Sequence, residues 1–228
     1  MNNPRPVNTH GKTLRKDNSM ALQQTLKSGP YRSEEMLQEL RFRICTTHPD
    51  TPMLLHEGKL AQEFGVSRTP IRQVLQRLSF EHMLETRSGV GTMVRTLDPM
   101  QRGLHFSMLS DILHLCTRCC AQNYTTQSRI HIATITELSA NPDNEPIARY
   151  FTLRAQFLEL ISSLVQDQIL AEAHAALHWR AIRWRMQAAN NDVDSAFAAL
   201  RNTITKVTAA DTPAALFECL AAEPEEVA

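Results

Sequence analysis

A chain of 228 residues with 43% apolar and 21% charged side chains can form one large globular domain or two of ordinary size. Its 7 glycines and 11 prolines exclude a low-complexity chain, and no apolar run approaches the roughly 20 residues of a membrane span. The net charge is zero, but residues 1–100 hold 14 Lys and Arg against 10 Asp and Glu, whereas residues 101–228 hold 10 against 14. The basic front half favours contact with a polyanion there.

The N-terminal segment and the cysteines indicate the compartment. Residues 1–30 are polar and lack an apolar core, so we expect a disordered tail rather than a signal peptide. Five cysteines, an odd number, then indicate reduced thiols and a cytoplasmic location. Cys116 and Cys120 share one face of an expected helix and are interpreted as small core residues. A metal or redox role is the alternative, but no second cysteine pair follows at zinc-ribbon spacing.

Residues 31–97 follow the order helix, helix, tight turn, helix, hairpin. The apolar spacing predicts helices over 31–46, from about 56 to 64 and from 67 to about 83. Two short β-type runs, 84–86 and 92–94, flank the glycine-containing loop "RSGVG". This order predicts a winged helix-turn-helix domain.

The third of these helices has an unusual first turn. In "GVSRTPIRQVLQRL", Ser67 is a good N-cap and Pro70 lies where its missing N–H is harmless. Arg68 and Arg72 lie in the first two turns, while the apolar residues follow at helical spacing behind them. In a helix-turn-helix the start of the second helix enters the major groove and its later turns pack on the domain. Small and basic residues at that point are what contact with phosphates and base edges requires.

The rest of the chain is predicted to be helical. After a linker at 98–103, we expect six helices at 104–122, 125–139, 145–165, 168–189, 193–208 and 212–222. The last six residues, "EPEEVA", are acidic and are expected to fray. The predicted fold class is therefore mainly α: a winged helix-turn-helix domain at 31–97, followed by an antiparallel all-α helical bundle at 104–228.

Residues 54–94 resemble the DNA-binding domain of GntR-type transcriptional regulators. The resemblance is carried by Leu-x-Glu-x-x-Leu-Ala from Leu55, by Gly-Val-Ser-Arg-Thr-Pro from Gly65, and by a wing that ends in Gly-x-Gly. It implies that the following residues contact DNA, the last four in the wing: Lys59, Ser67, Arg68, Thr69, Arg72, Gln73, Arg87, Ser88, Gly89 and Gly91. The chain departs from the family pattern with Gln73-Val74 in place of Glu-Ala, with His82 in place of a glycine, and with Gly58 at a position that is basic in some members.

The helical region is similar to that of the FadR-like subgroup, which implies a domain that binds a small effector and dimerises. Many members hold a metal through an Asp and a His in a middle helix, followed by two later histidines. Here Arg154 and Leu158 take the first two positions, and no histidine follows His178. Neither side chain ligates a divalent cation, so no metal and no other cofactor are expected.

Three residues are candidates for the effector site. Arg154 could pair with a carboxylate of the effector, or it could face water or a neighbouring Glu. His174 and His178 lie one helical turn apart and could hold a metal if Glu172, His131 or a cysteine completed the set. The alternative is a pair of histidines that are hydrogen-bonded or solvated.

The predicted function is a dimeric, sequence-specific DNA-binding transcription regulator. We expect a metabolite-responsive repressor that binds double-stranded operator DNA and a small, carboxylate-bearing effector, and that does not contact membranes. The alternative is a protein-interaction module on a helical scaffold without a small-molecule ligand. The sequence holds no nucleophile elbow, phosphate loop or recognisable pair of catalytic carboxylates, so an enzyme is not expected.

Overall fold

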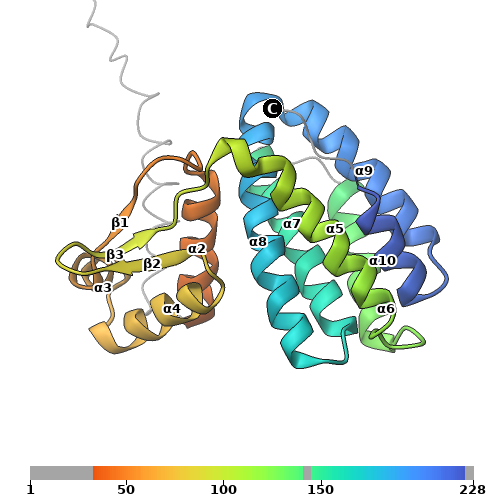
Figure 1. Cartoon of the computed structure of the whole chain (residues 1–228), viewed down its shortest axis with the longest axis horizontal. Coiled ribbons are helices and arrows are strands. Elements are labelled where there is room, and N and C mark those ends of the chain that lie inside the picture. Colours follow the sequence, from red (N-terminus) through yellow and green to blue (C-terminus); the bar gives the residue numbers. More distant parts are fainter. Residues whose placement is uncertain (1–32, 141–144, 224–228) are drawn as a thin grey trace, which may run out of the picture.

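The computed structural model describes residues 33–140 and 145–223, which form a small N-terminal domain beside a larger bundle of helices (Figure 1). The tail predicted for residues 1–30 lies outside the described residues. The N-terminal domain contains α2 (Ser33–Thr46), β1 (Leu54–Leu55), α3 (Glu57–Phe64), α4 (Arg68–Phe80), β2 (Leu84–Arg87) and β3 (Gly91–Val94). The winged helix-turn-helix prediction is confirmed.

The wing is a three-stranded antiparallel sheet in the order β1-β3-β2. Leu84 pairs with Val94 at the base of the β2–β3 hairpin, and Arg87 pairs with Gly91 at its tip. The sequence analysis did not predict β1, in which Leu54 pairs with Met93. A two-residue strand carries no periodic signal, and it forms because β3 offers a free edge next to the start of α3.

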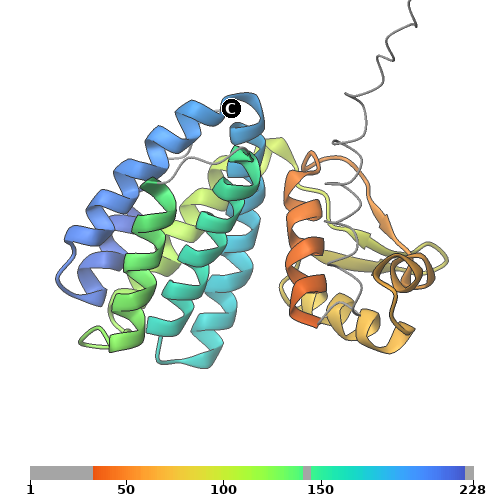
Figure 2. The same ribbon diagram turned by 180° about the vertical axis from the view of Figure 1, so that it is seen from behind.

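The helical domain comprises α5 (Arg102–Thr117), α6 (Thr126–Ala140), α7 (Pro146–Leu164), α8 (Gln168–Asn191), α9 (Val193–Ala209) and α10 (Pro213–Ala221). Each lies at one of the six predicted positions. Helix α5 is displaced from its prediction of 104–122, because Asp98 caps a 3-10 turn at Pro99–Gln101 that leads directly into α5. Five of the six residues of the predicted linker, 99–103, are therefore helical. Figure 2 shows the bundle from behind.

The two domains pack against each other mainly through α2 and α8, which lie side by side (Figures 1 and 2). The guanidinium group of Arg41 lies 4.6 Å from the ring centroid of Trp179, and the rings of Phe42 and Phe151 meet edge to face at 5.3 Å. Contacts of this kind each contribute about 0.5–1.5 kcal/mol beyond the burial of area. The position of the DNA-binding domain is thus fixed by a packed interface.

The prediction that Cys116 and Cys120 share one helix face was wrong, because α5 ends at Thr117, but both side chains pack on the core, Cys116 buried and Cys120 half-buried. Cys116 is buried in the last turn of α5, but Cys120 lies beyond the helix and forms an isolated β-bridge with Val165. All five cysteines are free thiols. None of the helices at 33–140 and 145–223 combines the length and the apolar character needed to cross a membrane.

Candidate nucleic-acid interface

The turn between α3 and α4 is built around Gly65. Its φ of 65° places it in the left-handed region, and its N–H donates to the carbonyl of Gln62 at 3.3 Å, while Val66 N–H donates to Ala61 at 3.0 Å. Glycine takes this conformation without the steric penalty of a Cβ atom. The turn leads into α4, which packs against α3.

The start of α4 is exposed and its later turns are buried. Ile71, Val74, Leu75 and Leu78 pack into the domain core, whereas Ser67, Arg68, Thr69, Arg72 and Gln73 are all exposed. Ser67 is the N-cap, yet its hydroxyl makes no hydrogen bond to the helix. The amide groups of the first turn therefore face outward at the positive end of the helix dipole, where phosphate oxygens bind.

Arg68 and Arg72 of α4 both lie next to the first turn of α3. Arg72 donates from Nε and Nη2 to the Glu57 carboxylate at 3.3 and 3.0 Å. This hydrogen bond lowers the pKa of Glu57. The Arg68 guanidinium lies next to Gly58, where a Cβ atom would be 3.6 Å from Nη2. A Cβ atom at position 58, where the chain departs from the family pattern, would thus be in ordinary van der Waals contact with Arg68.

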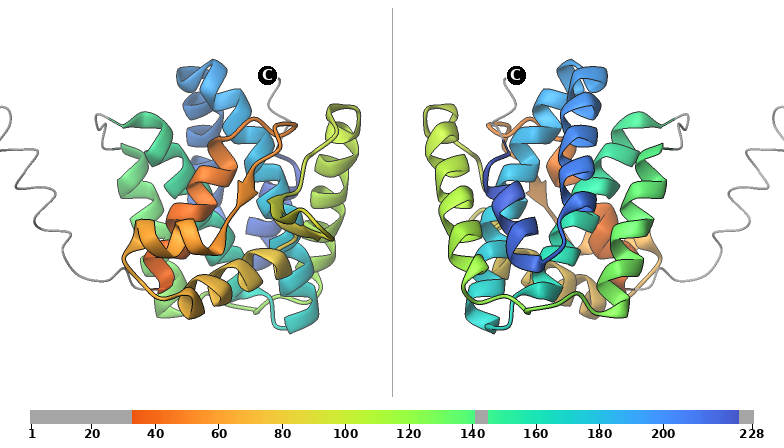
Figure 3. Two further views of the ribbon diagram at one scale, coloured as in Figure 1. Left: turned by 90° about the vertical axis from the view of Figure 1, so that its left-hand side faces the viewer. Right: turned by 90° about the vertical axis from the view of Figure 1, so that its right-hand side faces the viewer.

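The remaining predicted DNA contacts are exposed on neighbouring elements. Lys59 lies in α3, and the wing residues Arg87, Ser88, Gly89 and Gly91 surround the hairpin tip. The wing tip, α3 and the start of α4 lie on the side of the domain away from the helical bundle (Figure 1). Figure 3, left, looks onto this side. The structure thus brings the predicted residues to one accessible surface.

The three predicted effector residues meet inside the helical domain. Arg154 is 1% exposed, His174 0% and His178 4%. His174 Nε2 and His178 Nδ1 are 3.1 Å apart, so the prediction of hydrogen-bonded histidines is confirmed. Burial lowers the pKa of His174 to about 4, so the ring is neutral at pH 7. Within the described ranges, no group of three or more His, Cys, Asp and Glu side chains could hold a metal ion.

Sequence reasoning missed Glu223, the central group of this cluster. Glu223 is the first residue of the tail that was expected to fray. Its side chain is only 6% exposed, so that expectation was wrong for this residue. Its carboxylate lies 2.6 Å from Arg154 Nη1 and 2.6 Å from Arg185 Nη2. Thr203 donates a further hydrogen bond at 2.9 Å. Burial alone would raise the pKa of Glu223, but the two arginines outweigh it and bring the pKa from 4.5 to about 2.

The comparisons with known proteins agree with this geometry. The sequence profile described as "Bacterial regulatory proteins, gntR family" matches residues 32–94. The N-terminal domain is a GntR-family helix-turn-helix domain. No curated protein sequence matches the chain significantly.

Two solved structures are similar to this chain over most of its length. McbR/YncC of E. coli is 16% identical with a TM-score of 0.53, and a GntR transcriptional regulator of Rhodococcus sp. RHA1 is 14% identical with a TM-score of 0.56. Each alignment covers 83% of this chain and 91% of the other. The profile thus identifies the domain at residues 32–94 with that of bacterial regulatory proteins, and the two solved structures show that the fold of this chain is shared.

Proposed function

We propose that the protein is a sequence-specific transcription regulator, a metabolite-responsive repressor of the FadR-like subgroup that works in the cytoplasm as a homodimer. The observation that carries this proposal is the exposed start of α4, where Ser67, Arg68 and Thr69 stand clear of the core. One such helix makes few base contacts and gives little discrimination. Two helices on two half-sites roughly double it, and this is the physical reason for a dimer.

The DNA-binding proposal is tested by fluorescence anisotropy with the duplex upstream of the protein's own coding region. We expect the double variant Arg68→Ala/Arg72→Ala to bind at least ten times more weakly, because each good arginine contact contributes about 1–3 kcal/mol. The slope of log affinity against log salt should fall by about two. The control is Arg201→Ala, an exposed arginine on α9. Equal affinity of the double variant and the control would refute the assigned contacts.

The protein-interaction alternative makes the opposite prediction. A winged helix that recognises another protein has no reason to bind a duplex with a steep salt dependence. Affinity for double-stranded DNA that is absent, or that does not change between about 50 and 200 mM salt, would favour the alternative.

The effector part of the proposal places a carboxylate of the effector on Arg154, next to His174 and His178. Glu223 already supplies a carboxylate to Arg154 and Arg185, so an effector would have to replace it. The buried Nδ1 atom of His174 has no hydrogen-bond partner among the described residues and could receive a second polar group of the ligand.

Chemical rescue tests whether this site accepts an external carboxylate. Glu223→Ala leaves room for acetate, which has the carboxylate and the one methylene carbon that the substitution removes. We expect acetate to raise the melting temperature of Glu223→Ala more than acetamide does, and to leave the wild type unchanged. If the two compounds act alike on the variant, the site does not recognise carboxylates.

A further inference from the structure

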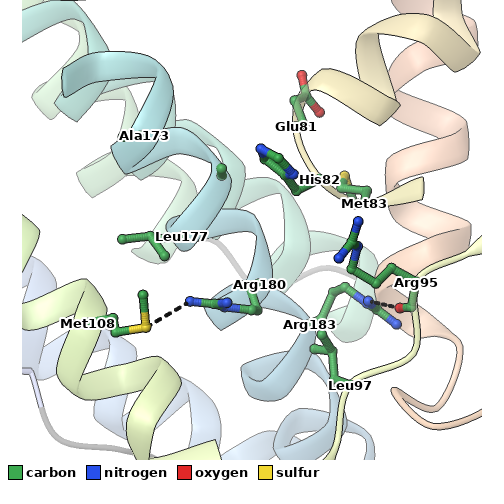
Figure 4. Close-up of a pocket in the computed structure, with 11 residues that line it drawn as sticks. Glu81, His82, Met83, Arg95, Leu97, Met108, Ala173, Leu177, Arg180 and Arg183 are labelled. Atoms are coloured by element: carbon green, nitrogen blue, oxygen red, sulfur yellow. Dashed lines mark hydrogen bonds between the residues drawn. The ribbon is translucent and has the colours of Figure 1, made fainter. Parts of the chain in front are cut away.

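A cavity of about 440 Å³ lies between the two domains (Figure 4). The N-terminal domain contributes residues that follow α4 and β3, and the helical domain contributes residues of α5 and α8. Met83, Leu97, Met108 and Leu177 form apolar parts of its wall. Its volume and mixed lining are those of sites that bind small molecules.

Three arginines line this cavity without an acidic partner. Among the described residues, no carboxylate forms an ion pair with Arg95, Arg180 or Arg183. Glu81 lines the same cavity, but its carboxylate is bound by Arg41 and by Arg77. The cavity therefore has an excess of positive charge.

Of the three arginines of α8, the two that line the cavity donate hydrogen bonds only to neutral groups. Arg183 donates to the backbone carbonyls of Arg95 at 2.6 Å and of Pro49 at 3.3 Å. Arg180 donates to the sulfur of Met108 at 3.6 Å, and Figure 4 shows this contact beside the cavity. Burial, and then the charge of Arg95, lower the pKa of Arg180. A partly buried cation without a counter-ion is unfavourable, and an anion in the cavity would relieve this.

We propose that the cavity between the domains binds a small organic anion. Arg180 and Arg95 hold its carboxylate or phosphate head, and its apolar body lies against the apolar wall formed by Met83, Leu97, Met108 and Leu177. Arginine presents a planar set of donors that fits either head group. The proposed effector site inside the bundle differs, because Glu223 already neutralises its two arginines. The cavity between the domains has no such internal ligand among the described residues.

An anion in this cavity would bridge the recognition helix and the helical domain. Glu81, His82 and Met83 connect α4 to β2, and the opposite wall is α8. His82 has a φ of 56°, in the left-handed region that residues other than glycine seldom occupy, and it projects toward α8 (Figure 4). A ligand that touches both walls fixes their distance, so its binding and DNA binding are linked. This regulatory step, unlike the binding itself, rests on the proposed function.

Binding is tested by isothermal titration of the full chain, without DNA, using octanoate and octyl phosphate as probes and octanol as the uncharged control. We expect at least one anion to bind with one site per chain and octanol not to bind. Arg180→Gln and Arg95→Gln should each weaken binding at least tenfold, whereas Arg180→Lys keeps the charge but not the planar set of donors and should bind with an affinity between those of the wild type and Arg180→Gln. Arg201→Gln, away from the cavity, should change nothing.

Three results would overturn the site: neither anion binds, octanol binds equally well, or Arg95→Gln and Arg180→Gln both bind like the wild type. Arg95 is exposed in a loop, so its variant tests the proposal even if Arg180→Gln fails to fold. The regulatory step is tested separately, by DNA affinity with and without the anion that binds. If the anion leaves the DNA affinity unchanged, the linkage is refuted but the anion site is not. If the protein does not bind DNA even in the absence of any anion, the proposed function itself is refuted.

Discussion

Replacing Glu223 by glutamine removes one negative charge from the centre of the helical domain and changes almost nothing in shape. In the wild type, both carboxylate oxygens are engaged, one by Arg154 and Thr203 and the other by Arg185. The amide oxygen of glutamine can still accept at one of the two oxygen positions, but its NH2 group faces an arginine donor at the other. Arg154 and Arg185 then lose the Glu223 carboxylate as a counter-ion in a buried site.

The expected loss follows from the pKa of Glu223. A fall from 4.5 to about 2 favours the ionised form by about 3 kcal/mol, since one pKa unit is equivalent to about 1.4 kcal/mol. This agrees with the roughly 3–5 kcal/mol lost when one partner is removed from a buried ion pair. For a chain of this length, about 3 kcal/mol lowers the melting temperature by about 6–12 °C.

The assay is urea unfolding of Glu223→Gln at pH 7, with Glu218→Gln on the exposed side of α10 as the matched control. Because the folded-state pKa of Glu223 is depressed, its contribution is complete above pH 4.5 and is lost as the pH falls toward 2. The difference in free energy of unfolding between wild type and variant should therefore shrink as the pH falls from 4.5 toward 2, over the pH range in which both proteins are still folded. A variant within about 0.5 kcal/mol of the control at pH 7 would refute the role given to this ion pair.

Three further predictions concern other parts of the chain. The folded-state pKa of His174 is about 4 against 6.5 for a free histidine, so the wild type should lose about 3 kcal/mol of stability as the pH falls from 6.5 to 4; His174→Gln should flatten this dependence in denaturant titrations. Gly65→Ala should destabilise the DNA-binding domain by about 1 kcal/mol and Gly65→Asn by less, measured by thermal unfolding, because only the left-handed backbone opposes the substitution. Glu57→Gln should change stability by less than about 1 kcal/mol, because its pair with Arg72 is exposed; a larger loss in calorimetry would contradict this assignment.

The DNA-binding surface could be predicted from the sequence because its signals are local. Gly65, the Ser67 cap and the apolar spacing from Ile71 to Leu78 together specify a turn and the face of the helix that follows. Exposure of Arg68 and Arg72 then follows from helical geometry alone, since the opposite face is apolar. The six helices of the bundle were predicted by the same kind of periodicity.

The interior of the bundle could not be predicted because its contacts join distant segments. Arg154 and Glu223 are 69 residues apart. An acidic residue in a terminal segment is normally exposed to solvent, so the sequence did not predict its burial. One signal was present: Arg154 lies among the apolar side chains of α7, and a guanidinium group buried there requires an acidic partner. The sequence did not indicate which of the 24 acidic residues would fill that role.

Helix α8 connects the features on which regulation would depend. His174, His178 and Arg185 are spaced by one and then two helical turns, so they lie on one face of α8, the face toward the charged cluster around Glu223. Arg180 and Arg183 leave the same helix toward the N-terminal domain, and Arg183 donates directly to its backbone. A rigid helix cannot turn or shift at one of these faces without moving the other. A ligand that replaces Glu223 and a ligand in the cavity between the domains would therefore both act on the position of α4, through one helix and its packing against α2.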